Sequence, residues 1–393
     1  KINSFIIKQA VKEAKEKEFE EMVPLLVKLQ DVLNFMAREM DMNSQKEVSK
    51  EDFISRVKQL IDYDKFVEDC EYYGTIVREE QKRSFIGSIG SFLEMWKGED
   101  DGYVRIIELA ETRTGGVVNL HYKCLDPSLL SETVLKDVHT AILMSGTLTP
   151  TDMYHDLLEF PARTVEREYD SPFSAENKMS LVVPLVSTKF TKRGVEEFTK
   201  IAMHLGKIVN AVPGNTAVYF PSYYLMSQVE GLFNEFCEKT IINERQGLSK
   251  EEKGELIETF KGYKDHGAVL MGVASGSFGE GIDLPGDFLK CVVVVGIPLS
   301  KPDIETKKLI EYYNEKFSRG WDYGYVLPAL TKVLQNAGRC IRSESDRGVV
   351  IYLDERYAWP SYSRVFPQDS IELCKDYEGK VIKFFAEATS TME

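Results

Sequence analysis

Short apolar runs separated by amphipathic segments fill the sequence from Val138 onward. The runs are TAILMSG, KMSLVVPLV, NTAVYFPS, AVLMGVASG, KCVVVVGIP and GVVIYLD. The stretch VVVVG is apolar at consecutive positions, and GVEEFTKIAMHLGKIVNAV has the apolar spacing of a helix. Strands that are apolar on both faces and alternate with helices are typical of a parallel sheet covered on both sides. The pattern therefore predicts an α/β fold for this part of the chain.

Residues 1 to about 100 show a helical pattern instead. Apolar residues recur with helical spacing from Met22 to Met36, Ser49 followed by Asp52 has the form of a capping box, and FIGSIGSFLEMW predicts a further short helix. We interpret the mixed-charge run KEAKEKEFEE as the solvated face of a helix. The alternating segments YVRIIEL and VVNLHYKCL around TRTGG predict a hairpin that leads into the next domain.

The composition limits the classes of protein that fit. A chain of 393 residues with 43% hydrophobic and 28% charged residues is typical of a soluble protein with two or three domains. No apolar run reaches the length that crosses a bilayer, so we do not expect a membrane protein. The net charge of -14 argues against binding nucleic acid by bulk electrostatics, and any nucleic-acid site must therefore be local.

The cysteines and the first residue add two expectations. The six cysteines lie far apart without a CxxC pair, so we predict no disulfide framework and no zinc or iron–sulfur site in this chain, and a reducing intracellular compartment. The sequence begins with Lys1 and shows no signal sequence. We therefore expect it to be a piece of a larger protein.

Polar and glycine residues follow several predicted strands, at the edge where open α/β sheets bind ligands. SGTLTP offers two hydroxyls and a glycine at Ser145, Gly146 and Thr147, and an ordinary polar turn is the alternative. PSYY places Ser222 beside two tyrosines, Tyr223 and Tyr224, which are available to stack on a base. Tyr219 and Phe220, within the strand, are interpreted as core residues.

The segment SFGEGIDLPG follows another predicted strand. Its glycines Gly279 and Gly281 allow a ligand to approach the backbone, while Ser277, Glu280 and Asp283 supply a hydroxyl and two carboxylates. A carboxylate beside such a loop can accept a hydrogen bond from a ribose hydroxyl or an arginine. The alternative is a glycine turn whose carboxylates point to water.

The segment QNAGRCIR precedes the last strand. On a helix, Gln335, Arg339 and Arg342 would share one face, and Gly338 would let another backbone come close. Two guanidinium groups on one face suit a triphosphate, because their donors match phosphate oxygens in pairs and remain charged at every working pH. A surface helix with salt bridges is the alternative.

Taken in order, SGTLTP, GNTAVYFPSYY, GSFGEGIDLPG and QNAGRCIR resemble motifs III, IV, V and VI of superfamily 2 DNA helicases. Together with LDERY at 353–357, they more closely resemble the XPD family of iron–sulfur helicases, over residues 138–360. Residues 1–110 resemble the helical insertion called the Arch, and CLDPS resembles the strand that returns to the first motor domain. The resemblance implies an Arch-like domain over 1–115, a remnant of the first motor domain over 116–150, and a second RecA-like motor domain over 151–393.

The family resemblance implies a 5'-to-3' DNA helicase of nucleotide excision repair, driven by ATP and Mg²⁺ and carrying an iron–sulfur cluster in the intact protein. The sequence contains no GxxxxGK[ST] phosphate loop, no DEAH box and no four-cysteine cluster. We therefore expect the chain to start just after the DEAH box and to be unable to turn over ATP alone.

The resemblance also assigns roles to residues. Arg342 would be the arginine finger, with Arg339 beside it and Gln335 orienting them or the attacking water. The nucleotide would be linked to the DNA side by Glu280, Gly281 and Asp283, and from the edge of the first domain by Ser145, Gly146 and Thr147.

Contacts to single-stranded DNA must come from local groups. The basic residues of KFTKRG are the best cluster, and Ser222 and Ser277 can donate to phosphates. Tyr223 and Trp321 can stack on bases, although a loop tryptophan can equally be a packing anchor. The basic residues concerned are Lys189, Lys192 and Arg193.

Two alternatives remain open. The chain could be a noncatalytic module that binds a protein partner on its Arch surface, or a DinG-like helicase, whose motifs are similar. We expect the protein to be cytoplasmic if it comes from a prokaryote and nuclear if it comes from a eukaryote.

Overall fold

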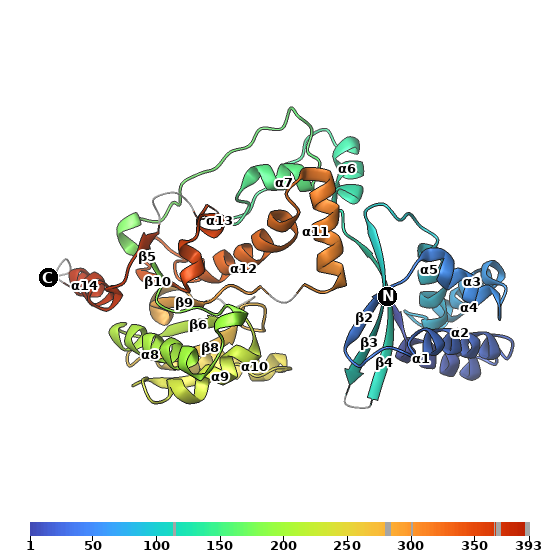
Figure 1. Cartoon of the computed structure of the whole chain (residues 1–393), viewed down its shortest axis with the longest axis horizontal. Helices are drawn as coiled ribbons and strands as arrows, with labels where there is room; N and C mark the ends of the chain where they lie inside the picture. Colours follow the sequence, from blue (N-terminus) through green and yellow to red (C-terminus); the bar gives the residue numbers. More distant parts are fainter. Residues whose placement is uncertain (113–114, 280–283, 300–301, 365, 367–370, 390–393) are drawn as a thin grey trace. The chain divides into compact units, whose positions relative to one another are not determined.

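The structure is a computed structural model that describes residues 1–112, 115–279, 284–299, 302–364, 366 and 371–389. The chain forms two compact units (Figure 1). Unit 1 contains Lys1–Ala141, Asp156–Phe160 and Lys301–Gly320, and unit 2 contains Ile142–His155, Pro161–Ser300 and Trp321–Glu393. Among the described helices, none combines the length and the apolar character that a membrane crossing requires.

Unit 1 combines helices with a four-stranded antiparallel sheet of order β1-β4-β3-β2. Its strands are β1 (Ile2–Asn3), β2 (Ser44–Glu47), β3 (Tyr103–Thr112) and β4 (Gly115–Cys124). Its helices are α1 (Ser4–Glu16), α2 (Met22–Met36), α3 (Lys50–Lys58), α4 (Tyr63–Glu80), α5 (Phe85–Trp96), α6 (Ser128–Asp137) and α11 (Ile304–Phe317).

Several of the predicted helices and their starting residues are confirmed. The apolar repeat from Met22 and the segment FIGSIGSFLEMW form α2 and α5. Ser49 caps α3 by accepting a hydrogen bond from Asp52 N at 3.0 Å. The mixed-charge run is mostly exposed, but Glu13 is buried and accepts hydrogen bonds from Ser84 Oγ and Ile86 N, both at 2.9 Å. The interpretation of this run as solvated is therefore wrong at Glu13.

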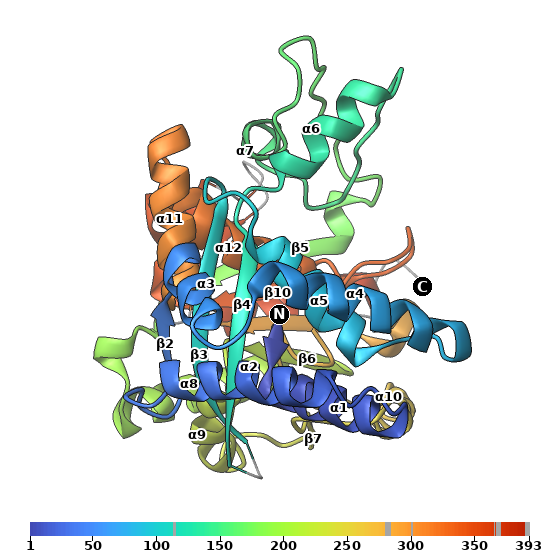
Figure 2. The same ribbon diagram turned by 90° about the vertical axis from the view of Figure 1, so that its right-hand side faces the viewer.

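Strand β3 contributes side chains to two cores, because alternate residues of a strand point to opposite faces. Ile107 packs with Val118 and Leu120 in the core shared with the helices α1 to α5. Val104 and Ile106, on the other face, pack against apolar side chains of α11. Figure 2 shows the helical layer beside the long β3–β4 hairpin.

The first compact unit extends beyond the boundary at 115 that the sequence suggested. The β3–β4 hairpin is paired from Tyr103↔Cys124 to Thr112↔Gly115, so it cannot be divided between two domains. The hairpin consequently lies inside unit 1, rather than leading into the next domain as predicted. The segment CLDPS ends β4 and starts α6, and it adds no strand to unit 2.

Unit 2 is built on a parallel sheet of order β11-β5-β10-β9-β6-β8-β7. Its strands are β5 (Lys178–Val183), β6 (Thr216–Phe220), β7 (Thr240–Asn243), β8 (Ala268–Val273), β9 (Cys291–Val295), β10 (Gly348–Leu353) and β11 (Glu372–Leu373). Its helices are α8 (Val195–Ala211), α9 (Tyr223–Phe233), α10 (Lys250–Gly262), α12 (Leu327–Ala337), α13 (Pro360–Ser363) and α14 (Tyr377–Thr389), and α7 (Thr151–Leu157) begins in this unit.

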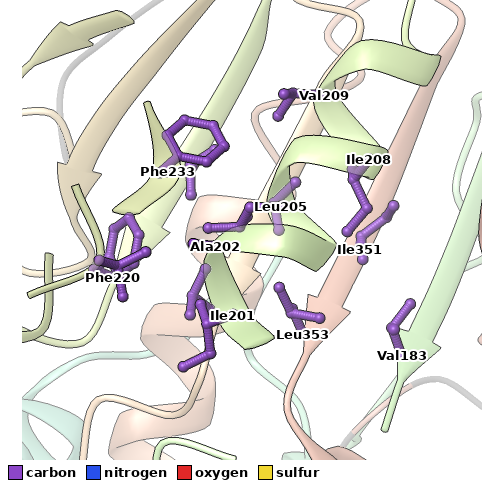
Figure 3. Close-up of a cluster of buried hydrophobic side chains, with 14 of the residues drawn as sticks. Val183, Ile201, Ala202, Leu205, Ile208, Val209, Phe220, Phe233, Ile351 and Leu353 are labelled. Atoms are coloured by element: carbon purple, nitrogen blue, oxygen red, sulfur yellow. The ribbon is translucent and has the colours of Figure 1, made fainter. Parts of the chain in front are cut away.

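Helices cover both faces of this sheet, as the apolar strands predicted (Figure 1). Helices α8 and α9 lie on one face and α12 lies on the other. Figure 3 shows Val183, Ile351 and Leu353 from the strands and Ile201, Leu205 and Ile208 from α8 in the core between them. The predicted α/β fold with a parallel sheet is therefore confirmed.

One predicted strand is not formed. The run TAILMSG is irregular, and Ile142 and Met144 are 78% and 86% exposed. A strand needs neighbours that pair with its backbone groups, and neither described sheet includes this run. The short edge strands β7 and β11, with four and two residues, were not predicted because so few residues give no clear alternation.

Candidate functional site

The carboxyl ends of the parallel strands of unit 2 meet at one edge of the sheet. The loops and helix starts that follow β5, β6 and β8 carry most of the residues predicted to contact DNA. The residues expected at the nucleotide follow β8 and α12. This edge, together with the loop that joins α12 to the amino end of β10, is the candidate functional site.

The loop after β8, residues 274–279, folds back on itself and is called here the β8 loop. Gly276 N donates to Val273 O at 2.8 Å, and Gly279 N donates to Gly276 O at 3.1 Å. A Cβ atom on Gly279 would collide with the carbonyl group of Ala274, so this position requires glycine. Glu280, Gly281 and Asp283 lie outside the described residues.

The end of α12 holds the β8 loop from one side. Asn336 is 1% exposed, and its Nδ2 donates to Ala274 O at 3.2 Å. Arg339 is 8% exposed, and its Nη2 donates to Gly279 O. Both side chains therefore fix the backbone of the segment that follows β8.

Gln335, Arg339 and Arg342 do not share a helical face, and this part of the prediction is wrong. Helix α12 ends at Ala337, and Gly338 is its C-cap with an ordinary right-handed backbone. Gln335 is exposed on the last turn, Arg339 is buried beyond the helix, and Arg342 is exposed in the loop that leads to β10. Gly338 is itself exposed, and the nearest atom to a Cβ placed there is Leu334 O of the same helix. Among the described residues, only backbone atoms of its own helix lie within 4 Å of that position.

Asp346 organises the loop that carries Arg342. Its buried carboxylate accepts hydrogen bonds from Arg342 N at 2.6 Å, Ser343 N at 2.9 Å and Gly286 N at 3.1 Å. Burial would raise the pKa of Asp346, but these hydrogen bonds and that of the Ser343 hydroxyl hold the pKa below its ordinary value. The backbone of Arg342 is therefore fixed while its side chain is exposed.

Glu244, directly after β7, is a residue that sequence reasoning missed. It is 2% exposed and accepts hydrogen bonds from Tyr223 Oη and Val273 N, both at 2.8 Å, and from Ser277 N. Burial and then the bond to Glu244 raise the pKa of Tyr223 to about 12. Because β7 is too short to recognise, the only available signal was a lone glutamate after the apolar pair Ile241 and Ile242.

The residues that follow β6 begin helix α9. Ser222 is the N-cap, and its Oγ accepts a hydrogen bond from Leu225 N at 3.2 Å. Tyr223 is half-buried and bound to Glu244 through its hydroxyl, whereas Tyr224 is exposed. Of the two tyrosines expected to be available for stacking, the exposed ring is therefore Tyr224.

The segment SGTLTP forms a turn in unit 2. Thr147 N donates to Ser145 Oγ at 3.2 Å, and the two hydroxyls lie 3.3 Å apart. Gly146 is exposed, and a Cβ atom there would meet nothing within 4 Å. The segment is thus a polar turn, and the predicted role of Ser145, Gly146 and Thr147 in coupling stays a prediction.

The predicted basic cluster follows β5 and is partly paired. Lys192 Nζ forms a 2.8 Å ion pair with Glu355, which raises the pKa of Lys192. Arg193 Nε donates to Thr188 O at 3.1 Å. Lys189 is exposed, with its Nζ 5.9 Å from the ring centroid of Trp359. Lys189 is consequently the residue of this cluster with the most accessible charge.

Trp321 stands at the start of the π-helix Asp322–Val326. Its side chain is 53% exposed and lies against Tyr325, with the ring centroids 4.7 Å apart. The ring is half-exposed and packs against Tyr325, so its stacking on a base stays a prediction. Among the described residues, no group of three or more His, Cys, Asp or Glu side chains is arranged to hold a metal ion.

Two family models match most of the chain. The Helicase C-terminal domain matches residues 205–371, which contain the β8 loop and the Arg342 loop. The Helical and beta-bridge domain matches residues 6–192, which contain the helices and the hairpin of unit 1. The chain is a relative of the XPD-type superfamily 2 helicases.

Curated relatives agree with this assignment. The chain is 25% identical over 320 residues to the general transcription and DNA repair factor IIH helicase subunit XPD of Dictyostelium discoideum, covering 76% of this chain and 41% of that protein. It is also 25% identical over 298 residues to the 3'-5' exonuclease DinG of Staphylococcus saprophyticus, covering 73% and 31%. The chain thus spans less than half the length of these relatives.

Solved structures support the fold. The chain matches S. tokodaii Xpd4 with a TM-score of 0.63 and 20% identity, covering 95% of this chain and 71% of that one. It matches the structure named XPD_APO with a TM-score of 0.60 and 22% identity, covering 94% and 72%. At these identities the likeness concerns the fold of the chain and not its chemistry.

Proposed function

We propose that this chain forms part of an ATP-dependent 5'-to-3' DNA helicase of the XPD type that acts in nucleotide excision repair. Within it, the chain supplies the arginine-finger side of the ATP cleft and part of the path of single-stranded DNA. The phosphate loop, the DEAH carboxylates that bind Mg²⁺ and the iron–sulfur cluster would belong to protein beyond these residues. ATP in the cleft would supply the free energy for movement.

The single observation that carries the proposal is the way the β8 loop is held from two sides. Asn336 and Arg339, next to the Arg342 loop, bind its carbonyl groups. Glu244 binds the N–H of Ser277 in the loop and that of Val273, the last residue of β8. A conformational change at the nucleotide would be transmitted to the residues that contact DNA, because both groups of residues are bound to the β8 loop.

Arg342 is the residue we assign to the transition state of phosphoryl transfer. It is exposed, and its backbone is fixed by a hydrogen bond to Asp346, so the loop that carries it is ordered before an anion binds. Arg339 is committed to Gly279, and we assign it a positioning role instead of the direct contact first expected. Gln335 is exposed on the last turn of α12, where it remains our candidate for orienting Arg342 or water.

The DNA path follows the strand exits. We assign phosphate contacts to Lys189, Ser222 and Ser277, and base stacking to Trp321 and Tyr224. Tyr223 would support the path through Glu244. Backbone and stacking contacts of this kind give binding with little sequence preference.

The test is the binding of a fluorescent oligodeoxythymidylate by the purified chain, followed by anisotropy. We expect a Kd on the order of micromolar at 50 mM salt and a loss of at least about tenfold at 200 mM, because phosphate contacts release counterions. Lys189→Ala should reduce the salt dependence, with the ion-paired Lys200→Ala on α8 as the control. Absence of binding at both salt concentrations would rule out this DNA path.

One observation favours a second function, a noncatalytic module that binds a protein. Unit 1 exposes several large apolar side chains, namely Phe5, Val27, Phe35, Met42 and Met95. Isolated surface apolar residues are common, so this observation is weaker than the clamped β8 loop. The scaffold function would be favoured by a chain that captures a protein partner but does not bind the oligonucleotide.

A further inference from the structure

Glu244 connects segments that follow three neighbouring strands. The residue itself continues from β7, its partner Tyr223 is the first residue of α9 after β6, and Val273 and Ser277 belong to the end of β8 and to its loop. The backbone of Glu244 also extends the sheet, since its N–H donates to Met271 O at 2.8 Å. The backbone of Glu244 is therefore fixed in the sheet, while its carboxylate binds the end of β8, the loop after it and the start of α9.

The local glycines are explained by the same carboxylate. A Cβ atom at Gly272 would lie 2.9 Å from Glu244 Oε2, and one at Gly276 would collide with Oε1. Neither glycine has a left-handed backbone, so space and not backbone conformation requires glycine there. The stretch MGVASG thus fits around the Glu244 side chain.

The pattern of donors requires a carboxylate and not an amide. Oε1 accepts from Tyr223 Oη and Ser277 N, and Oε2 accepts from Val273 N. A glutamine would place an NH₂ group against at least one of these donors, because only one of its two end atoms accepts hydrogen bonds. A buried donor would then lose its partner, which is costly.

We propose that Glu244 is a positioning residue for single-stranded DNA: by binding Tyr223 and Ser277 together, it fixes the β8 loop against the start of α9. Ser222, the N-cap of α9, and Ser277 are then presented at a constant spacing to successive phosphates. This inference rests on the proposed DNA path. Glu244 itself does not touch the DNA.

The variant Glu244→Gln distinguishes a positioning role of Glu244 from the effect of its negative charge on DNA affinity. It removes a negative charge beside the DNA path, so electrostatics alone predicts tighter binding of an oligodeoxythymidylate. Positioning predicts the opposite, a loss of about tenfold in affinity, as expected for one lost buried hydrogen-bond partner. Affinity equal to or tighter than that of the unaltered chain would overturn the proposal.

Two further variants complete the design. Tyr223→Phe removes one donor and leaves the two N–H bonds, so it should fold normally and weaken binding by a few fold. Glu230→Gln is the matched control, because its carboxylate binds the Asn243 side chain in the same region but contacts no residue of the β8 loop in the described structure. An affinity loss in Glu230→Gln as large as in Glu244→Gln would also overturn the proposal.

Amide hydrogen exchange gives a readout that does not depend on DNA. In the unaltered chain the amides of Val273 and Ser277 should be protected, and in Glu244→Gln they should exchange at least about tenfold faster. If the unaltered chain binds no DNA, the proposed function fails, while exchange still decides whether Glu244 anchors the loop. Unchanged exchange at Ser277 in Glu244→Gln would reject that anchoring.

Discussion

At the scale of single residues, two arginines three positions apart have different surroundings. Arg339 is buried against the carbonyl of Gly279, whereas Arg342 is exposed and its N–H is bound by Asp346. A planar guanidinium suits both tasks, since its donors match a carbonyl as well as phosphate oxygens. Of the two side chains, that of Arg342 is the more exposed, and we propose it as the one that contacts an anion.

For Arg342 we expect a loss of catalysis with little loss of nucleotide binding. In a helicase that contains this chain together with a phosphate loop, Arg342→Ala should lower ATP hydrolysis by about three to five powers of ten and change ATP affinity only a few fold. Arg342→Lys should recover part of the loss, because it restores charge without the paired donors. Steady-state kinetics with Arg167→Ala as an exposed control decide this, and unchanged turnover in Arg342→Ala would exclude the finger role.

At the scale of elements, helix α11 is joined to the end of the β3–β4 hairpin through Asp126. The carboxylate of Asp126 is buried and binds Lys316 Nζ at 2.6 Å, the Tyr312 hydroxyl and Ser128 N at 2.8 Å. Burial would raise the pKa of Asp126, but these hydrogen bonds outweigh it and keep the pKa below its ordinary value. Asp126 therefore stabilises this arrangement in its ionised form.

The pH dependence follows from that direction. A carboxyl group with a folded-state pKa below its unfolded-state value of about 3.9 contributes stability above that value, and the contribution is lost as pH falls through the folded-state pKa. Asp126→Asn should lower the free energy of unfolding by about 1.5–3 kcal/mol at pH 7 and by progressively less below pH about 4. Chemical denaturation at both pH values, with the exposed Asp137→Asn as control, checks this; an equal loss at both would contradict it.

At the scale of the whole molecule, the strands predicted from the sequence are found where an apolar run also has neighbouring strands to pair with. Strands β5, β6, β8, β9 and β10 were predicted because each lies inside the sheet and is apolar on both faces. The run TAILMSG has the same pattern but no described pairing partner, and a sequence pattern cannot reveal whether a partner exists. The family resemblance located the strand exits, whereas the buried bonds of Glu244 and Asp346 depend on long-range contacts that no local motif encodes.

For the molecule as given we expect no DNA-stimulated ATP hydrolysis. Without a loop to bind the phosphates and carboxylates to bind Mg²⁺, Arg342 has no positioned phosphoryl group to stabilise. Phosphate release from the purified chain, measured with and without oligodeoxythymidylate, should equal the buffer background. Activity that co-purifies with the chain and is abolished by Arg342→Ala would contradict this expectation.

The irregular run at Ile142–Met144 affects how the protein behaves in solution. Ile142, Leu143 and Met144 hold large apolar side chains in water along a stretch rich in β-forming residues. An exposed apolar segment of this kind can form backbone hydrogen bonds with an unpaired edge strand, including one on a second copy of the same chain. We therefore expect these three side chains to promote self-association in concentrated samples. A charged residue in place of Met144 should reduce it.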